Sequence, residues 1–403
     1  MKCDIAIIGG GAAGFFTAIN AATQNPKLKF VILERGKEVL SKVRISGGGR
    51  CNVTHDCMDP RELVKNYPRG EKELLGPFSK FGPKQTIEWF ESRGVALKTE
   101  SDGRMFPISN KSQTIIDCFL NECRKLGIVI ETGIVVKDIQ KTADSFEITT
   151  TTQPVHAQKV VVAAGSSAKV WDILQNLGHN IIPPIPSLFT FNVVEKEITA
   201  LAGISKRVSV SIPQLKLKQV GNLLITHWGF SGPAVLRLSA VAARELAKLE
   251  YRFQIQIDWL NEDSTTADYE TELRTLLLEH HKKTILNTNI FGFSNRHWLF
   301  LLEKTAIPQQ KKIAELSKKD YRAMATVLRS DAYQINGKST FKEEFVTAGG
   351  VSLKDINFKD FSSKKTENLY IVGECLNIDA VTGGFNFQNA WTGGFLAAMA
   401  LTQ

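Results

Sequence analysis

The glycine run near the start of the chain most constrains what it can fold into. An apolar run at residues 3–9 leads into Gly9-Gly10-Gly11-Ala12-Ala13-Gly14, which has the spacing G-x-G-x-x-G. A second apolar run, from Leu28 to Leu33, ends in Glu34, twenty residues after Gly14. A strand, a glycine turn, a helix, a second strand and an acidic residue make up a dinucleotide-binding βαβ unit. We therefore expect the chain to open with a Rossmann-type fold.

Each position of this fingerprint has its own role. Gly9 permits the turn, Gly11 lets the backbone approach a pyrophosphate, and Gly14 lets the helix pack closely against the strand. The helix expected at residues 12–24 offers free N–H groups and a positive dipole end to phosphates. Glu34 can accept hydrogen bonds from ribose hydroxyls.

Length and charge limit the possible classes of protein. The 403 residues are enough for two or three domains. The 50 basic residues exceed the 41 acidic ones by nine, which favours an anionic cofactor or substrate. The densest basic stretch, Lys311–Arg322, has interleaved acids at helical spacing, so we interpret it as a solvated helix face. This charge pattern therefore argues against nucleic acid as a partner.

Cysteine spacing and hydropathy indicate no further chemistry. The six cysteines contain no Cys-x-x-Cys pair, so we expect free, reduced thiols and no metal site. The longest apolar stretch, residues 5–22, is interrupted by glycines and has no basic leader or cleavage site. We expect no membrane segment and a cytoplasmic protein.

Composition breaks divide the chain into three parts. Pro183, Pro184 and Pro186 mark one boundary, and Thr347–Val351 marks the return. Residues 1–187 and 345–403 are expected to form the Rossmann-like domain. Residues 188–262 and 331–344 are expected to form an inserted β-rich domain, and residues 263–330 a helical subdomain.

The C-terminal segment favours FAD over NAD. An apolar run at residues 369–372 is followed by Gly373-Glu374, where an acid can contact the ribitol of FAD. The helix expected after Gly384 would aim its N-terminus at the flavin ring, where the positive dipole end stabilises charge on the reduced flavin. A nicotinamide dehydrogenase does not need this return of the chain. The predicted fold is therefore α/β, with a discontinuous FAD-binding domain of the glutathione-reductase type.

At this point the sequence resembles a known family, the YhiN/BaiN-type NAD(P)/FAD-dependent oxidoreductases, also labelled aminoacetone-oxidase-family FAD-binding proteins. Besides the N-terminal fingerprint, the resemblance rests on residues 45–54 (ISGGGRCNVT), 103–107 (GRMFP), 226–233 (THWGFSGP), 347–351 (TAGGV) and 373–388. It covers nearly the whole chain and implies an FAD domain with an inserted β-rich domain and a helical subdomain. Three departures leave the substrate open: Ala164-Gly165-Ser166 replaces Thr-Gly-Gly, no second glycine-rich stretch precedes Leu177-Gly178-His179, and Phe385 replaces a common Tyr.

The fingerprint and the resemblance together predict the cofactor-binding residues. These are Gly9, Gly11, Ala12, Ala13, Gly14, Glu34, Arg35, Arg44, Gly49, Arg50, Cys51, Val135, Ala164, Gly165, Gly373, Glu374, Gly384, Asn386 and Phe387. The two arginines beside the glycine-rich segment at residues 46–49 suit an anion. Cys51 lacks a partner thiol or base at a readable spacing, so we favour a packed residue over a redox thiol.

His227 is the best candidate for proton transfer, although a structural histidine is the simpler interpretation. The leading hypothesis is a flavin-dependent oxidoreductase. The resemblance implies either a reductase of small or steroid-like enones, for which NAD(P)H would serve as electron donor, or an amine or aminoketone oxidase. The sequence shows no second G-x-G-x-x-G, so a nicotinamide would bind transiently at the flavin. A tRNA-modifying enzyme and a non-catalytic flavoprotein remain as alternatives.

Overall fold

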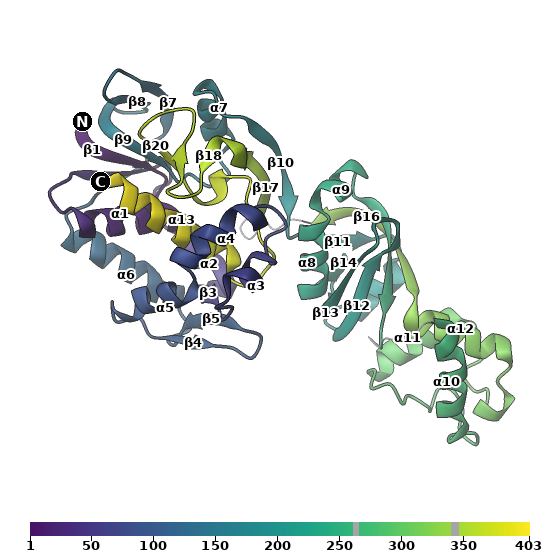
Figure 1. The fold of residues 1–403 in the computed structure, drawn as a ribbon. Helices are drawn as coiled ribbons and strands as arrows, with labels where there is room; N and C mark the ends of the chain where they lie inside the picture. The colour runs from purple at the N-terminus through teal and green to yellow at the C-terminus, as the bar shows by residue number, and fades with distance from the viewer. Residues whose placement is uncertain (261–265, 340–345) are drawn as a thin grey trace. The chain divides into compact units, whose positions relative to one another are not determined.

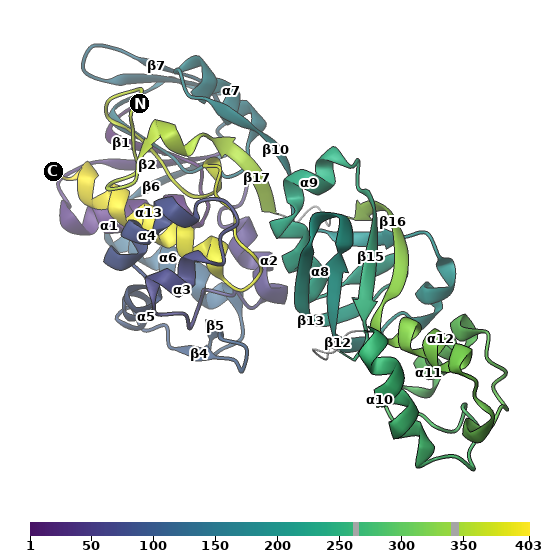
Figure 2. The same cartoon turned by 45° about the vertical axis from the view of Figure 1, so that its right-hand side comes forward.

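The structure is a computed structural model that describes residues 1–260, 266–339 and 346–403, except for the side chains of residues 266 and 267. The chain divides into two compact units (Figures 1 and 2). Unit 1 contains Met1–Ser187 and Phe341–Gln403, and unit 2 contains Leu188–Thr340. The chain leaves unit 1 after strand β10 (Ile181–Ser187) and returns at strand β17 (Val346–Val351), which pair with each other in antiparallel fashion.

The core of unit 1 is a parallel sheet. Its strands β20 (Leu369–Ile371), β9 (Val155–Val162), β1 (Lys2–Ile8), β2 (Phe30–Glu34) and β6 (Val129–Thr132) follow one another in that order. Each neighbouring pair is parallel. The short strands β18 (Ile356–Asn357) and β19 (Ser362–Ser363) extend the sheet beyond β20. This arrangement confirms the predicted Rossmann-type fold.

Two features of the sheet bear on the sequence interpretation. The three β-like runs at residues 135–140, 146–151 and 155–162 form a small antiparallel meander, because β7 (Val136–Lys141) pairs with β8 (Phe146–Thr150), and β8 pairs with β9 in antiparallel fashion. The apolar run at residues 128–131 had the pattern of a buried strand, and this prediction is wrong. Val129 is 45% exposed because β6 is the last strand in the order beside β2.

Helices α1 (Ala12–Gln24) and α13 (Phe385–Leu401) lie side by side in unit 1 (Figures 1 and 2). A Cβ added at Gly394 of α13 would lie 3.0 Å from the Thr17 Oγ1 of α1, so the two helices approach closely. The fully buried Trp391 ring lies 5.2 Å from Phe16 and 5.6 Å from Phe119 of helix α6 (Ser112–Lys125), so Trp391 is a core residue.

The remaining elements of unit 1 are short. Its other helices are α2 (Ser41–Gly49), α3 (Pro60–Val64), α4 (Glu71–Lys80), α5 (Pro83–Glu91) and α7 (Ala168–Asn176). A small antiparallel sheet contains β3 (Thr54–His55), β5 (Arg104–Pro107) and β4 (Leu97–Thr99). In the part of the chain that the structure describes, no helix has both the length and the apolar character needed to span a membrane.

Unit 2 is built on a closed six-stranded barrel. Its order is β11 (Thr190–Val193), β14 (Gly229–Ser231), β13 (Leu217–Ile225), β12 (Ser205–Ile212), β15 (Arg252–Asp258) and β16 (Asp331–Ser339). Its helices are α8 (Pro233–Val241), α9 (Ala243–Lys248), α10 (Thr266–Leu278), α11 (Asn295–Thr305) and α12 (Lys318–Arg329).

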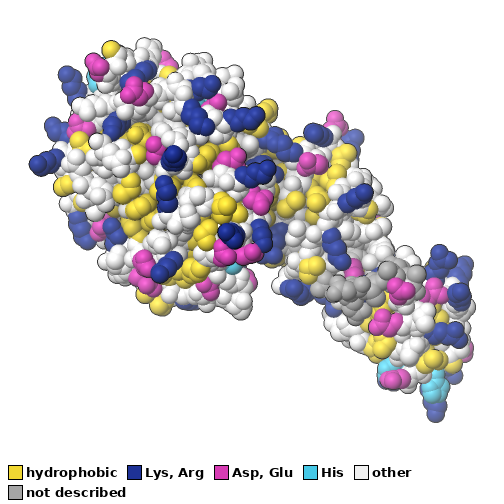
Figure 3. Space-filling model, in the orientation of Figure 1, with side chains coloured by type: hydrophobic (Ala, Val, Ile, Leu, Met, Phe, Trp, Pro, Cys, Tyr) yellow, Lys and Arg dark blue, Asp and Glu magenta, His cyan; other side chains and the backbone are white. Residues whose placement is uncertain are grey.

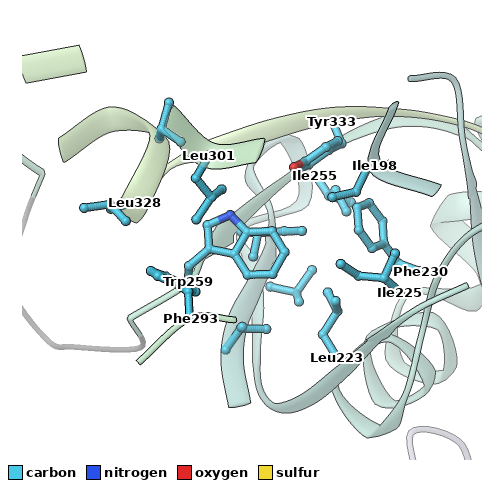
Figure 4. Packing of buried hydrophobic residues seen from close by; sticks show 14 of the residues in the cluster. Ile198, Leu223, Ile225, Phe230, Ile255, Trp259, Phe293, Leu301, Leu328 and Tyr333 are labelled. Atoms are coloured by element: carbon cyan, nitrogen blue, oxygen red, sulfur yellow. The ribbon is translucent and has the colours of Figure 1, made fainter. Parts of the chain in front are cut away.

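One hydrophobic cluster contains residues from both the barrel and the helices of unit 2. Figure 4 shows the buried Trp259 side chain among Phe293, Leu301 and Tyr333. The further division of this region into a β-rich domain and a helical subdomain stays a prediction.

Candidate cofactor site

The predicted cofactor residues of unit 1 gather where its parallel strands end. Strands β1, β2, β9 and β20 run in the same direction, so their carboxyl ends meet at one edge of the sheet. Gly9, Glu34, Ala164 and Gly373 stand at these ends. In open α/β sheets this edge is where dinucleotides bind.

The glycines of the first turn differ in what surrounds them. Gly9 has φ +112°, and a Cβ there would lie 2.5 Å from the carbonyl oxygen of Ala163. A Cβ at Gly14 would overlap the carbonyl oxygen of Gly9, so the helix can pack this closely only with glycine. A Cβ at Gly11 would meet no atom within 4 Å. The backbone at Gly11 is therefore open to a ligand, as the approach of a pyrophosphate requires.

Helix α1 begins here without protein groups that would compete with an anion. Its N-cap is Gly11, no side chain caps its first N–H groups, and its first turn contains no acidic residue. The N–H groups of a first helical turn have no partner within the helix, and they carry the positive end of the dipole. Together with the open backbone at Gly11, this start fits the diphosphate of FAD.

The adenosine side of the site is formed by Glu34 and the segment beside it. The Glu34 carboxylate accepts hydrogen bonds from the backbone N–H groups of Gly10 and Gly36, at 2.7 Å each. A carboxylate can accept further bonds, so Glu34 can still receive a ribose hydroxyl. The N–H of Ile134 donates to the Glu34 carbonyl oxygen at 2.9 Å, which places the neighbouring Val135 at this end of the site. Arg35 is exposed.

The glycine-rich segment after β2 is part of helix α2, which is broken by non-helical dihedral angles at residues 46–48. Gly49 is exposed. The exposed Arg44 donates to Gln113 Oε1 at 2.8 Å. Arg50 forms a 2.6 Å ion pair with Glu100 and lies 4.0 Å from the centre of the Phe106 ring. Both arginines therefore have protein partners, and their contact with a diphosphate stays a prediction.

Cys51 is a packed residue, as the sequence favoured. Its side chain is fully buried, and burial raises the pKa of its thiol to about 12. A thiol with such a pKa has almost no thiolate at neutral pH, and the thiolate is the reactive form. Burial therefore favours a packing role for the Cys51 side chain, and its backbone can still border a cofactor.

The C-terminal segment returns to the start of α1. A Cβ at Gly373 would lie 3.1 Å from the Cβ of Ala13, and one at Gly165 would lie 3.7 Å from Glu374 Oε2. The Glu374 carboxylate accepts a 2.5 Å hydrogen bond from Lys42 Nζ of α2. The structure thus brings Ala13, Gly165 and Glu374 together as predicted from their separate motifs. Sequence reasoning missed Lys42, which lies outside the glycine-rich motif.

Helix α13 also starts at a glycine without a side-chain cap. Gly384 has φ +92°, and a Cβ there would lie 2.6 Å from the Thr54 carbonyl oxygen. The first turn of α13 contains no acidic residue. Two predicted contacts have other partners, because the Asn386 amide bonds to the backbone of Ala380 and the Phe387 ring stacks on Trp391.

The two histidines that merit attention lie in different units. His227, the predicted proton donor, belongs to unit 2, where it is exposed in the turn between β13 and β14. In unit 1, the ring of His55 on β3 stacks on Phe385, the first residue of α13, with centroids 4.7 Å apart and an interplanar angle of 21°. Sequence reasoning missed His55, although it directly follows the motif at residues 45–54.

The described elements can bind an extended dinucleotide along one edge and stabilise negative charge at two helix starts. Within residues 1–260, 266–339 and 346–403, no group of three or more His, Cys, Asp and Glu residues could hold a metal ion.

Comparison with known proteins agrees with this geometry. The model of the HI0933-like protein Rossmann domain matches residues 3–400. The 3-dehydro-bile acid delta(4,6)-reductase of Clostridium scindens is 27% identical and covers 99% of each chain. The ribosomal RNA dihydrouridine synthase of Escherichia coli is 26% identical over 99% of this chain and 98% of its own.

Among solved structures, the 3-ketosteroid delta1-dehydrogenase of Sterolibacterium denitrificans aligns with a TM-score of 0.52 and 10% identity. The alignment covers 100% of this chain and 99% of that one, and it shows a shared fold. The family match spans nearly all of the sequence and includes the strands whose carboxyl ends form the candidate cofactor site. The chain therefore belongs to the HI0933-like family and is an FAD-dependent oxidoreductase.

Proposed function

We propose that this protein reduces a C=C bond conjugated to a carbonyl group in a small organic molecule, with NAD(P)H as the electron donor. The observation that carries the proposal is the start of α13. It offers an uncapped, acid-free helix N-terminus where the C-terminal return of the chain would meet the flavin ring. Such a positive end favours the negatively charged, reduced form of a flavin.

The bound FAD would supply two-electron hydride chemistry. The protein's own residues bind and orient it. The start of α1 and the open backbone at Gly11 would hold the diphosphate, Glu34 would receive the adenosine ribose, and Glu374 would contact the ribitol. The Lys42 ammonium orients the Glu374 carboxylate through their 2.5 Å bond. Together these residues would orient the bound cofactor along the edge of the sheet.

Reduction of a conjugated C=C bond adds a hydride to one carbon and a proton to the other, while NAD(P)H is oxidised to NAD(P)⁺. The proton needs a donor within hydrogen-bond reach of the acceptor carbon. His227 remains the donor proposed from sequence, and His55 is a second candidate because it packs against the first residue of α13. Substituting each in turn distinguishes them, because only the true donor should lower the rate of product formation without slowing flavin reduction.

The relatives support the reductive direction. A delta(4,6)-reductase and a dihydrouridine synthase both take their names from saturation of C=C bonds. Charge supports the small substrate. On the face shown in Figure 3, Lys and Arg side chains are interspersed with Asp and Glu and do not form one basic patch.

The test is anaerobic reduction of the purified flavoprotein by NADH and by NADPH, followed by acceptors. We expect at least one nicotinamide to bleach the visible flavin absorbance, and a 4-en-3-one steroid or a simpler enone to restore it. Bleaching by an amine or aminoketone with neither nicotinamide active would instead identify an oxidase. If the flavin responds to no reductant in the panel, the proposal is wrong and a binding role gains support.

A second candidate substrate is uridine in RNA. Residues 198–244 contain six Lys and Arg residues but no Asp or Glu, which leaves one long stretch of unit 2 without carboxylates. Contacts to RNA phosphates weaken steeply with salt. Reoxidation of the reduced protein by an unmodified rRNA fragment, in a salt-dependent manner and faster than by any enone, would favour this candidate.

A further inference from the structure

A buried carboxylate connects the turn that precedes α13 to two other segments of unit 1. Asp379 is fully buried, and both of its oxygens accept hydrogen bonds from the guanidinium of Arg69. Its Oδ2 also accepts a 2.7 Å bond from the hydroxyl of Ser187. A bidentate pair of this kind fixes both distance and orientation.

The same turn has further attachments to the segment around Arg69. The N–H of Val381 donates to the Asn66 carbonyl oxygen at 2.9 Å, and the Tyr67 hydroxyl donates to the Phe385 carbonyl oxygen at 2.6 Å. Inside the turn, the Asn386 amide bonds to both backbone groups of Ala380. The turn is therefore held in place by several hydrogen bonds. It leads directly into α13, which begins at Phe385.

Ser187 gives this arrangement a second connection. It is the last residue of β10 and of the first segment of unit 1, and it pairs with Val346, the first residue of β17. The Asp379 carboxylate thus joins the turn before α13 to the end of the β10–β17 pair from which the chain leaves unit 1. All of these contacts lie within unit 1.

From this geometry we propose that Asp379 is a positioning residue that sets where the start of α13 meets the flavin, and that it couples this position to the outer end of β10. The proposal goes beyond the reaction proposed above and needs no substrate. It rests on the predicted contact between α13 and the flavin ring. If the turn moves, the positive helix end moves relative to the ring, and the reduced flavin loses stabilisation.

The experiment compares Asp379→Asn with the parent protein and with a matched control. Asn keeps the size of the side chain but places an NH₂ group against donors from Arg69 or Ser187. We expect at least tenfold weaker FAD binding. We also expect a tenfold shift toward oxidised flavin in a redox titration, which is about 30 mV for a two-electron couple. Ser187→Ala should shift the titration in the same direction by a smaller factor.

The control is Asp355→Asn. Asp355 is also buried, and it accepts a 2.8 Å bond from the N–H of Asn180, just before the other end of β10. We expect it to lower the melting temperature while leaving the flavin titration and FAD affinity within twofold of the parent. Equal effects from both variants would show that Asp379 contributes only to overall stability, and would overturn the proposal. An unchanged flavin titration in Asp379→Asn would overturn it as well. If Asp379→Asn does not fold, Ser187→Ala and Arg69→Lys decide by the same two readouts.

Discussion

The two units use their sequences in opposite ways. At the carboxyl edge of unit 1, glycines serve two purposes. At Gly14 a side chain would collide with backbone, and at Gly11 a side chain would fill the open space that a ligand needs. In unit 2, the barrel interior is filled with large side chains, and the buried Asp331 carboxylate accepts hydrogen bonds from Trp259 and Tyr333. Unit 1 leaves backbone accessible for a ligand, whereas the cluster in unit 2 serves packing.

This difference predicts two kinds of mutational effect. Changes at the edge of unit 1 should act on FAD binding, whether or not they alter stability. Changes in the core of unit 2 should act on stability and leave FAD binding alone. The predictions below test this separation, from the largest expected effect to the smallest.

Gly14→Ala should abolish FAD retention. The added Cβ would overlap the Gly9 carbonyl oxygen, so either the helix or the turn must shift and the diphosphate cradle is lost. We expect at least a hundredfold weaker binding, about 2.7 kcal/mol, measured by fluorescence titration of the apoprotein with FAD.

Gly11→Ala is the matched variant for this prediction. Its Cβ meets no protein atom within 4 Å, so the apoprotein should melt at the parent temperature. It should nevertheless bind FAD at least tenfold more weakly, because the methyl group stands where the phosphate approaches. Normal FAD affinity in Gly11→Ala would place the cofactor elsewhere.

The glycine edge could be predicted from sequence because each glycine answers a local geometric requirement. Gly9, Gly14 and Glu34 follow from one short motif, and the structure shows the collisions that the motif implies. The partners of Glu374 and Asp379 could not be found in the same way. Lys42 and Arg69 lie more than 300 residues away in the chain, and their side chains have no periodic signal.

Asp331→Ala should destabilise unit 2 strongly. Its carboxylate is 3% exposed and accepts hydrogen bonds from Trp259 Nε1 at 2.9 Å and the Tyr333 hydroxyl at 2.6 Å, together with the ammonium of Lys304. Removal leaves the buried Trp259 N–H and Tyr333 hydroxyl without their acceptor, which typically costs about 1–3 kcal/mol for each group. Urea unfolding followed by tryptophan fluorescence measures the loss.

Glu303, an exposed residue next to Lys304 in the chain, provides the control for Asp331→Ala. Glu303→Ala should change the free energy of unfolding by less than about 0.5 kcal/mol. FAD affinity should be that of the parent in both variants. Weaker FAD binding in Asp331→Ala, measured where the protein is still folded, would contradict the separation between the units.

The barrel shows what pattern alone cannot give. The short strands and the helix after Gly232-Pro233 are visible in the sequence, because alternation and proline mark them. Closure of the six strands depends on pairings such as β11 with β16, which join residues more than 140 positions apart. No local property of Phe191 or Lys338 indicates that they are neighbours.

His297 should make the stability of unit 2 depend on pH. It is 1% exposed, and burial, with a smaller contribution from the nearby Lys206 ammonium, lowers the pKa of its imidazole to about 4, from 6.5. The folded protein therefore holds it neutral. The contribution of the neutral imidazole to the free energy of unfolding is complete above pH 6.5 and declines as the pH falls toward 4. Its full loss amounts to roughly 3 kcal/mol.

Urea unfolding at pH 7 and pH 4.5, for the parent and for His297→Gln, measures this dependence. We expect the parent to lose more stability on acidification than the variant, because the variant has no imidazole to protonate. Equal losses in the two proteins would show that other groups govern the acid response.

Cys51→Ala should have the smallest effect on function, although Cys51 lies at the edge of unit 1. With the pKa of its thiol near 12, it carries almost no thiolate at neutral pH. We expect flavin reduction and turnover within twofold of the parent, and a loss of about 1 kcal/mol in the free energy of unfolding. Thiol labelling of the native protein should reach the partly exposed Cys57 before Cys51. Labelling of Cys51 first, or loss of flavin reduction in the variant, would show that the Cys51 thiol takes part in the reaction. The contrast between the units would then weaken, because the edge of unit 1 would act through a side chain as well as through its backbone.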